Sequence, residues 1–236
     1  MTVKRTLIID ADDTLWENNI YYEQSIEEFA ELMAEKGFDR DEAVQMMHAV
    51  ERERVPVVGY APEEFARSMV IAYERLCQRD ERPVEADVSA RVLAIGRQVI
   101  GYPMVLLEGV EETLDWLRGY CRLMLLTKGD QAIQADKLDR SGLAHFFDQV
   151  HIVPEKDVAV FQDLIAEHDL DPAQTWMVGN SPRSDVNPAL GAGLGAIYVP
   201  HPDTWVMELE EIAEPDGAIV LKSFADLVTW LSALTD

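Results

Sequence analysis

The sequence contains few cysteines and no long apolar run. Its two cysteines, Cys77 and Cys121, are too few for a disulfide framework in a chain of 236 residues, so a reducing compartment is expected. No segment approaches the roughly 18 apolar residues that a membrane span requires. The apolar run after Lys4 and Arg5 is also too short for the core of a signal peptide. These absences favour a cytoplasmic location and argue against a membrane-embedded protein.

Positive charge is also scarce. The chain has 20 Lys and Arg against 44 Asp and Glu, which gives a formal net charge of −24. Such a surface repels nucleic acid and anionic membranes, so neither is expected as a partner. An anionic substrate would need a bound divalent cation or local basic residues to overcome this field. Apolar residues make up 48% of the chain, enough for a buried core, and nothing in the sequence indicates the oligomeric state.

Short apolar runs rich in β-branched residues recur along the chain and, from the second run onward, alternate with helical patterns. The predicted strands are residues 6–10, 122–127, 149–153, 175–179, 196–199 and 218–221. The predicted intervening helices are residues 110–118, 131–140, 158–168 and 185–192. This alternation is typical of an α/β protein with a doubly wound parallel sheet.

The long segment after the first predicted strand contains only helical patterns. Apolar residues recur at helical spacing, as in Ile26, Phe29 and Met33, and predict helices over residues 22–36, 41–52, 63–79 and 86–100. We therefore expect an α/β core domain of residues 1–16 and 103–236 and an inserted helical cap domain of residues 17–102. Such an insert is expected to act as a lid, and a stabilising appendage is the alternative.

Three carboxylates follow the first predicted strand in the sequence TLIIDADDTLW. They are Asp10, Asp12 and Asp13, and Thr14 comes next. Carboxylates that are buried together are costly unless a cation or hydrogen bonds compensate. Asp10 and Asp12 at the end of a buried strand therefore indicate a metal site and catalysis, whereas the alternative is an ordinary acidic turn. Asp13 is expected only to stabilise that turn.

Polar residues also follow the later predicted strands. Thr127 and Lys128 end the second strand, Lys156 lies in a loop before a helix, and Asn180 and Asp185 follow the fourth strand. In a doubly wound sheet these loops share the edge where ligands bind, near the topological switch point. Taken singly, each residue has an ordinary explanation: a strand-end threonine, a solvated lysine or a helix cap.

Together, in this order, the motifs resemble those of phosphatases of the haloacid dehalogenase (HAD) superfamily, whose Rossmann-like core carries an inserted helical cap of the C1 type. The resemblance spans the whole chain. It rests on four motifs, which are here the Asp10, Asp12 and Thr14 segment, Thr127, Lys156, and the segment from Gly179 and Asn180 to Asp185.

The resemblance implies a role for each of these residues. Asp10 would be the nucleophile that forms an aspartyl-phosphate, and Asp12 the general acid and then the general base. Thr127, with Lys128 beside it, would bind the phosphoryl group, and Lys156 would stabilise its charge. Mg²⁺ would be held by the Asp10 carboxylate, the Asp12 backbone carbonyl and the side chains of Asn180 and Asp185.

Two features refine this implied activity. Much of the family has Asp where this chain has Asn180, whose amide oxygen can coordinate a cation without contributing a charge. The dehalogenating branch lacks an acid at the position of Asp12, so phosphate-ester hydrolysis is favoured here. We also expect replacement of Lys156 by Ala to reduce turnover with little loss of stability, because a loop lysine packs little.

The residues that would contact the substrate are less clearly indicated by the sequence than the catalytic ones. Trp16 and Asn18 lie just past the nucleophile, and Arg54 and Tyr60 lie in an expected cap loop of residues 52–60, so these four are candidate substrate contacts. Pairing with neighbouring glutamates on a solvated helix is the alternative for the arginines of that loop. Four histidines without ligand spacing are expected on the surface: His48, His145, His151 and His168.

The sequence thus predicts a cytoplasmic, Mg²⁺-dependent phosphomonoesterase that acts on a small phosphorylated metabolite. A sugar phosphate and a nucleoside monophosphate both remain open as substrates. The alternatives are a phosphomutase of the same superfamily, which uses the same nucleophile, and a catalytically weak regulatory or binding protein that retains the fold.

Overall fold

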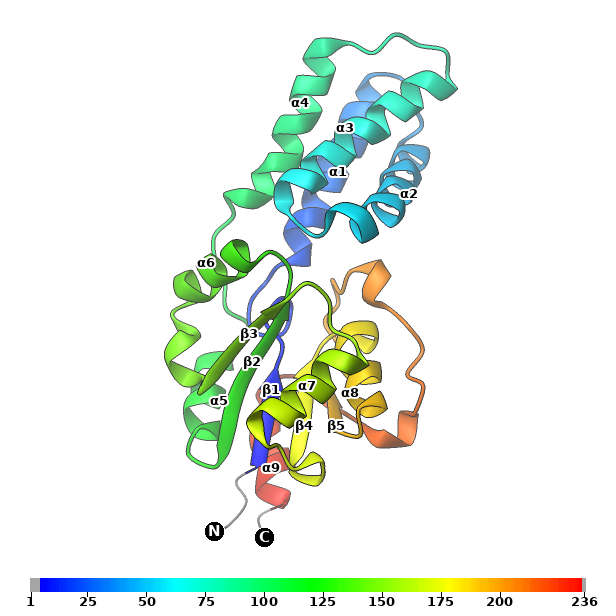
Figure 1. Cartoon of the computed structure of the whole chain (residues 1–236). Helices are drawn as coiled ribbons and strands as arrows, with labels where there is room; N and C mark the ends of the chain where they lie inside the picture. Colours follow the sequence, from blue (N-terminus) through cyan, green and yellow to red (C-terminus); the bar gives the residue numbers. More distant parts are fainter. Residues whose placement is uncertain (1–4, 235–236) are drawn as a thin grey trace. The chain divides into compact units, whose positions relative to one another are not determined.

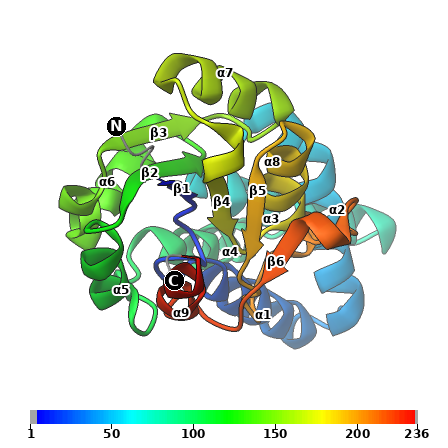
Figure 2. The same ribbon diagram turned by 90° about the horizontal axis from the view of Figure 1, so that it is seen from below.

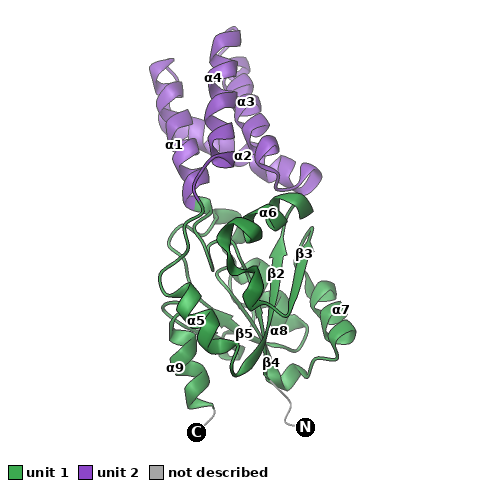
Figure 3. Cartoon of the chain, turned by 90° about the vertical axis from the view of Figure 1, so that its left-hand side faces the viewer, with its two compact units in different colours: residues 1–19, 104–236 green, residues 20–103 purple. Residues whose placement is uncertain are grey.

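The computed structural model describes residues 5–234 of the chain. The chain divides into two compact units, which are coloured separately in Figure 3. The core unit comprises Met1–Asn19 and Met104–Asp236, and the helical unit comprises Ile20–Pro103. The boundaries expected from the sequence, after residues 16 and 102, lie within a few residues of these.

A sheet of six parallel strands forms the centre of the core unit, in the order β3-β2-β1-β4-β5-β6 (Figure 1). The strands are β1 (Arg5–Ile9), β2 (Cys121–Lys128), β3 (Gln149–Val153), β4 (Thr175–Gly179), β5 (Gly195–Tyr198) and β6 (Ala218–Val220). At the centre of the sheet, Ile9 of β1 lies opposite Leu125 of β2 and Val178 of β4. The predicted α/β fold with a doubly wound parallel sheet is confirmed.

Helices cover both faces of this sheet (Figure 2). Successive side chains of a strand point to opposite faces. Leu7 and Ile9 therefore pack on one side, with α5 (Val110–Leu117), α6 (Gln131–Ser141) and α9 (Asp226–Ala233). Ile8 packs on the other side, with α7 (Val158–His168) and α8 (Asn187–Gly191). Burial on both faces explains why the strands read as nearly continuous apolar runs.

The helices that follow β2 and β3 have side-chain caps at their first turns. The carboxylate of Asp130 accepts hydrogen bonds from the backbone N–H groups of Ala132 and Ile133 at the start of α6. The carboxylate of Asp157 accepts from the N–H of Val160 at the start of α7. These caps fix where each helix begins after its strand, and so fix the loop that follows Lys128 and the loop that carries Lys156.

The helical unit contains four helices, α1 (Asn19–Glu35), α2 (Arg40–Val58), α3 (Pro62–Arg79) and α4 (Ala86–Arg97). Its core is separate from that of the sheet and includes Phe29, Met33, Met69 and Leu76. Gly96 allows α4 to approach α3 closely, because a Cβ at this position would lie 2.5 Å from the Cα of Ala66.

Two expectations about local structure are wrong. Residues 52–58 continue α2 instead of forming a loop, because Pro56 lies in the last turn of the helix and removes only one hydrogen-bond donor. The bounds expected for the helix over residues 185–192 are also wrong, because α8 is confined to Asn187–Gly191 and follows a turn of π-helix, Pro182–Val186. None of the helices in the described part of the chain is both long and apolar enough to cross a membrane.

Candidate active site

The strand order reverses between β1 and β4. The chain moves outward from β1 to β2 and β3 on one side, and from β4 to β5 and β6 on the other. Ligands of doubly wound proteins bind at the carboxyl ends of the strands beside such a switch point. Asp10 follows β1 directly, and its backbone N–H donates to the Val178 carbonyl of β4 at 2.9 Å. The first carboxylate of the sequence motif therefore lies at the switch point.

Five polar residues from three segments, which follow β1, β3 and β4, meet at this position. Lys156 Nζ forms an ion pair with Asp10 and donates to Asp185 Oδ1 at 2.7 Å. Thr14 Oγ1 donates to Asp10 Oδ2 at 2.9 Å and lies 3.3 Å from Asn180 Oδ1. All five residues are at most 6% exposed. The structure thus brings together Asp10, Thr14, Lys156, Asn180 and Asp185, which the sequence motifs had singled out.

The electrostatics of this cluster are those of two carboxylates around one ammonium group. Burial raises the pKa of Asp185 to about 7; Lys156 opposes that rise, and the negative charge of Asp10 adds to it. Burial by itself lowers the pKa of Lys156, but Asp10 and Asp185 outweigh burial and hold it above its usual value. One positive charge therefore leaves the pair of buried carboxylates incompletely neutralised.

Backbone geometry after β4 makes room for Asp185. A Cβ on Gly179 would lie only 2.1 Å from Asp185 Oδ2, so no side chain fits at residue 179. Asp185 Oδ2 also accepts a hydrogen bond from the backbone N–H of Ser181 at 3.0 Å. Gly179 of the fourth motif thus has a steric role. Because it lacks a side chain, the Asp185 carboxylate can lie against the end of β4, the strand that precedes it.

The burial of Lys156 corrects one expectation. Its side chain is 2% exposed and touches two carboxylates, although the residue lies in a loop. The premise that a loop lysine packs little is therefore wrong at this position. Loss of its ammonium group would leave Asp10 and Asp185 buried without their counter-charge, which is strongly unfavourable.

The Asp12 carboxylate is held by three side chains outside this cluster. Its carboxylate accepts hydrogen bonds from Trp16 Nε1 at 2.7 Å and Gln134 Nε2 at 3.0 Å. Lys137 Nζ lies 2.9 Å from both of its oxygens. Burial raises the pKa of Asp12, but the Lys137 ammonium and the hydrogen bonds from Lys137, Gln134 and Trp16 together outweigh burial and hold that pKa below its usual value.

Thr127 and Lys128, at the end of β2, have different surroundings. Gln134 Nε2 donates to Thr127 Oγ1 at 2.6 Å, which links the end of β2 to Asp12. The Lys128 ammonium pairs with the buried Glu208 and donates to Ser184 Oγ at 2.9 Å. The positive charge of Lys128 is thus paired with Glu208, and phosphate binding by Lys128 stays a prediction.

The four candidate substrate contacts are divided between the two units, with Trp16 and Asn18 in the core unit and Arg54 and Tyr60 in the helical unit. Trp16 is buried, with its only polar hydrogen donated to Asp12, and the Asn18 side chain accepts from Lys137 at 2.9 Å. Arg54 belongs to the helical unit, where it pairs with Glu64 at 2.7 Å. Tyr60 is half-buried just after α2. The alternative interpretation, that the cap arginines pair with neighbouring glutamates of their own helix, does not hold for Arg54, because its partner lies on α3.

Sequence reasoning missed three residues at the site: Gln134, Lys137 and Glu208. Gln134 and Lys137 are three residues apart on α6, so they share one helix face, and this spacing was the available signal. Glu208 lies well beyond β5 and accepts from both Ser181 Oγ and Ser184 Oγ at 2.6 Å. No pattern in the sequence connects it to the fourth motif.

Two of the histidines expected on the surface lie together. His151 of β3 and His168 of α7 have their Nε2 atoms 2.9 Å apart, and both are at least partly buried. Arg122, which can only donate, has a guanidinium nitrogen 3.3 Å from His168 Nδ1. The proton of His168 therefore lies on Nε2 and is donated to His151, so a hydrogen-bonded chain links β2, α7 and β3.

A second group of possible ligands lies beside the first motif. Asp13, Glu17 and His201 present oxygen and nitrogen atoms within 4.8 Å of one another, so they could hold a cation. Asp13 also accepts hydrogen bonds from the backbone N–H groups of Asn18 and Asn19, at 2.8 and 3.0 Å. The expectation that Asp13 stabilises the turn is confirmed.

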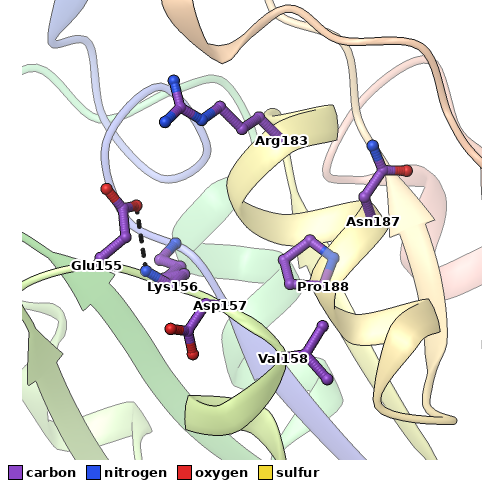
Figure 4. Close-up of a pocket in the computed structure, with 7 residues that line it drawn as sticks. All are labelled: Glu155, Lys156, Asp157, Val158, Arg183, Asn187 and Pro188. Atoms are coloured by element: carbon purple, nitrogen blue, oxygen red, sulfur yellow. Dashed lines mark hydrogen bonds between the residues drawn. The ribbon is translucent and has the colours of Figure 1, made fainter.

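A pocket of about 340 Å³ adjoins the Lys156 loop (Figure 4). It lies between the start of α7 and the segment that leads into α8. Its lining residues are Glu155, Lys156, Asp157, Val158, Arg183, Asn187 and Pro188. In this view Glu155 accepts a hydrogen bond from the Lys156 backbone N–H, at 3.2 Å, which helps to hold the lysine loop in place.

The sheet topology and the buried carboxylates at its switch point are typical of an α/β enzyme, and they make the carboxyl ends of β1 and β4 the candidate active site. Residues 4–193 match the family model of haloacid dehalogenase-like hydrolases. The chain belongs to this family, and it is a hydrolase of that type. A crystal structure of a haloacid dehalogenase-like family hydrolase from Xanthomonas campestris is similar over 98% of this chain and 96% of its own, with 29% identity and a TM-score of 0.77.

Other known proteins are also similar to this chain. The magnesium-bound crystal structure of the putative HAD-hydrolase YfnB from Bacillus subtilis covers 98% of this chain and 99% of its own, at 18% identity and a TM-score of 0.64. The pyrimidine 5′-nucleotidase YjjG of Escherichia coli is 30% identical over 99 residues, which are 39% of this chain and 44% of that protein. Further curated relatives are named as phosphatases, and the chain spans less than half of the length of each.

Proposed function

We propose that this protein is a Mg²⁺-dependent phosphomonoesterase that hydrolyses a small phosphorylated metabolite through an aspartyl-phosphate on Asp10. The observation that carries the proposal is the buried cluster of Asp10, Lys156 and Asp185 at the switch point, with Asp12 held nearby. The names of the relatives that match part of the chain support phosphate-ester hydrolysis.

The donor set at the switch point fits a hard divalent cation. Asp10, Asp185 and Asn180 supply carboxylate and amide oxygens, the ligands that Mg²⁺ prefers. The raised pKa of Asp185, caused first by burial, indicates that the two carboxylates lack sufficient positive charge. When bound here, Mg²⁺ would neutralise this charge and polarise a phosphoryl oxygen. Asn180 adds no charge, and Thr204 fixes its orientation by accepting from Nδ2 at 3.0 Å.

In the first half of the proposed reaction, an Asp10 carboxylate oxygen attacks phosphorus and forms a new O–P bond. The bond from phosphorus to the ester oxygen breaks, and its electron pair stays on that oxygen, which takes a proton from the protonated form of Asp12. Lys156 stabilises the charge on the transferring group. Gln134 donates to the Thr127 hydroxyl, so the hydroxyl proton of Thr127 can be donated to a phosphoryl oxygen.

In the second half, water attacks the phosphorus of the aspartyl-phosphate. Asp12, now a carboxylate, takes a proton from that water, and the bond between phosphorus and Asp10 breaks. Inorganic phosphate leaves and Asp10 is restored. The same two carboxylates thus serve both halves, with Asp10 as nucleophile and leaving group and Asp12 as acid and base.

The helical unit is proposed to be the cap that selects the substrate. It follows the first motif directly in the chain, and it has its own apolar core. A cap that excludes bulk water favours small phosphorylated metabolites over phosphoproteins. The cytoplasmic location stays a prediction from the composition.

The proposal is tested with p-nitrophenyl phosphate, in Mg²⁺ and in chelator, using the wild type and Asp10→Asn. We expect release of p-nitrophenol with one inorganic phosphate each, dependent on Mg²⁺ and reduced by orders of magnitude in the variant. Asp115→Asn is the matched control, because this α5 side chain is 71% exposed. Its activity should equal that of the wild type.

Other outcomes would replace the proposal. Turnover that survives in Asp10→Asn would exclude the aspartyl-phosphate route. Transfer of phosphate to a second hydroxyl, without stoichiometric inorganic phosphate, would indicate a phosphomutase. Failure to hydrolyse this ester and a panel of phosphorylated metabolites would indicate a binding protein that retains the fold.

A further inference from the structure

The Asp12 carboxylate is surrounded by donors from two different elements. Trp16, four residues later in the same loop, donates through Nε1 at 2.7 Å. Gln134 and Lys137 reach it from α6, at 3.0 and 2.9 Å. These three side chains make the hydrogen bonds to the Asp12 carboxylate. Two of them come from α6, which lies more than 100 residues later in the chain.

Lys137 is the strongest of these donors. Its ammonium group contacts both Asp12 oxygens and also donates to Asn18 Oδ1, each at 2.9 Å. An ammonium group has three protons, so these contacts use its donor capacity fully. The lysine side chain is 18% exposed and that of Asp12 is 24% exposed, so the pair is shielded from most of the solvent. A charge-assisted hydrogen bond that is shielded from solvent holds its partner in one orientation more strongly than a neutral hydrogen bond does.

Gln134 connects this arrangement to the end of β2. Its amide nitrogen is within hydrogen-bond distance of Asp12 Oδ2, Thr127 Oγ1 and the Lys128 carbonyl, at 3.0, 2.6 and 3.1 Å. The residue is 4% exposed. The acid–base carboxylate and the expected phosphate-binding hydroxyl thus share one buried amide, and α6 fixes the position of both.

We propose that Lys137, supported by Gln134, is a positioning residue that holds the Asp12 side chain in the orientation needed to protonate the leaving oxygen. This inference rests on the proposed function. Lys137 itself does not touch the substrate or exchange a proton. Asp12 donates its proton to the ester oxygen as the bond from that oxygen to phosphorus breaks and the bond from phosphorus to Asp10 forms. Without Lys137 the Asp12 carboxyl group would rotate away, and proton transfer would be inefficient.

The kinetic consequence depends on the leaving group. A nitrophenolate leaves readily without a proton, whereas an unactivated phenolate needs one. In Lys137→Met, kcat/KM for p-nitrophenyl phosphate should change little, and kcat/KM for phenyl phosphate should fall roughly 10- to 100-fold more. Because kcat/KM reports steps up to the first irreversible bond cleavage, later hydrolysis of the aspartyl-phosphate does not obscure the comparison. Lys137→Arg should retain much of the kcat/KM for phenyl phosphate that Lys137→Met loses.

The experiment measures kcat/KM for a series of substituted phenyl phosphates in the wild type, Lys137→Met, Lys137→Arg and Arg140→Met. Arg140 is a matched control, because it is a half-exposed cation on the same helix that pairs with Asp136. The inference predicts a steeper dependence on leaving-group basicity in Lys137→Met alone. An equal loss for every ester, or no loss, would overturn it.

A crystal structure of Lys137→Met supplies a readout that needs no turnover. The Asp12 carboxylate should leave the position in which it accepts from Trp16 Nε1, and an unchanged position would overturn the inference. If the wild type hydrolyses none of the esters, the proposed function fails, and this structure still decides whether Lys137 holds Asp12. Should Lys137→Met not fold, Lys137→Gln retains a donor of shorter reach and is compared in the same way.

Discussion

The Lys156 side chain places one positive charge against two buried carboxylates, Asp10 and Asp185. Removal of one partner from a buried ion pair costs about 3–5 kcal/mol, because the other charge stays buried without compensation. Lys156→Met should therefore lower the free energy of unfolding by about 3 kcal/mol at neutral pH, in addition to reducing turnover by orders of magnitude. Urea denaturation in chelator measures the first effect.

A matched lysine separates this effect from simple loss of charge. Lys222 is exposed, and Lys222→Met should change the free energy of unfolding by no more than about 0.5 kcal/mol. Added Mg²⁺ should restore part of the stability of Lys156→Met, since a cation can neutralise the same carboxylates. If Lys156→Met were as stable as the wild type, the two carboxylates would not depend on this lysine.

His151 makes stability depend on pH. Burial lowers its pKa, and the neighbouring His168 and Arg122 add to that shift, while Glu167 opposes it. The unfolded chain therefore binds a proton more readily than the folded protein, so this histidine reduces stability as the pH falls through and below about 6.5. The decrease in Tm from pH 7.5 to pH 5 should be smaller in His151→Gln than in the wild type.

His145→Gln is the matched control, because it removes an exposed histidine and leaves the contact between His151 and His168 in place. Parallel pH profiles for His151→Gln and the wild type would contradict the assignment of a lowered pKa to His151.

The candidate site could be predicted only where a residue type stands directly after a strand. Asp10 and Asn180 do so, Thr127 is the second-last residue of β2, and the parallel sheet brings such positions to one edge. Lys156 was located, but its burial depends on two carboxylates from other loops. Gln134, Lys137 and Glu208 depend on how α6 and the segment after β5 lie against those loops, and a single sequence carries no direct signal for such packing.

Among the elements, α3 and α4 lie unusually close at one point. A Cβ on Gly96 would lie 2.5 Å from Ala66 Cα and 2.8 Å from Ala66 Cβ, and neither atom is the end of a flexible side chain. Gly96→Ala should therefore destabilise the helical unit by about 1–3 kcal/mol through overpacking, despite the better helix propensity of alanine. Far-UV circular dichroism during urea denaturation measures the change.

Gly101 provides the matched glycine. Its nearest atom to a new Cβ is Gln98 O at 3.7 Å, an ordinary contact, so Gly101→Ala should be nearly neutral. All five tryptophans lie in the core unit, so fluorescence follows the core while circular dichroism also reports the helical unit. A Gly96→Ala variant as stable as the wild type would show that α3 and α4 can separate at little cost.

Most element positions followed from periodicity and turn residues. The strands 149–153 and 175–179 and the helix 158–168 were predicted with the bounds that the structure has. The errors in the predicted helix bounds lie where a rule based on the local sequence does not hold. Pro56 stands in the last helical turn instead of ending α2 earlier, and a π-helical turn carries Asp185 back to the end of β4.

For the whole molecule, the net charge of −24 makes any cation stabilising, because the folded state concentrates like charges. Mg²⁺ should nevertheless raise Tm more than NaCl of equal ionic strength, since binding to the native state adds its own stabilisation. This excess should be much reduced in Asp185→Asn and retained in the exposed variant Asp115→Asn. Equal shifts with both salts would indicate screening alone.

The proposed reaction requires that Asp10 becomes phosphorylated. The most direct measurement mixes the Asp12→Asn variant with p-nitrophenyl phosphate and Mg²⁺, stops the reaction with acid within milliseconds to seconds, and maps the phosphoryl group by mass spectrometry. Without its base the variant should accumulate the intermediate, so the account predicts one phosphoryl group on the peptide that contains Asp10. A phosphoryl group elsewhere, or none although the wild type turns over, would contradict the account.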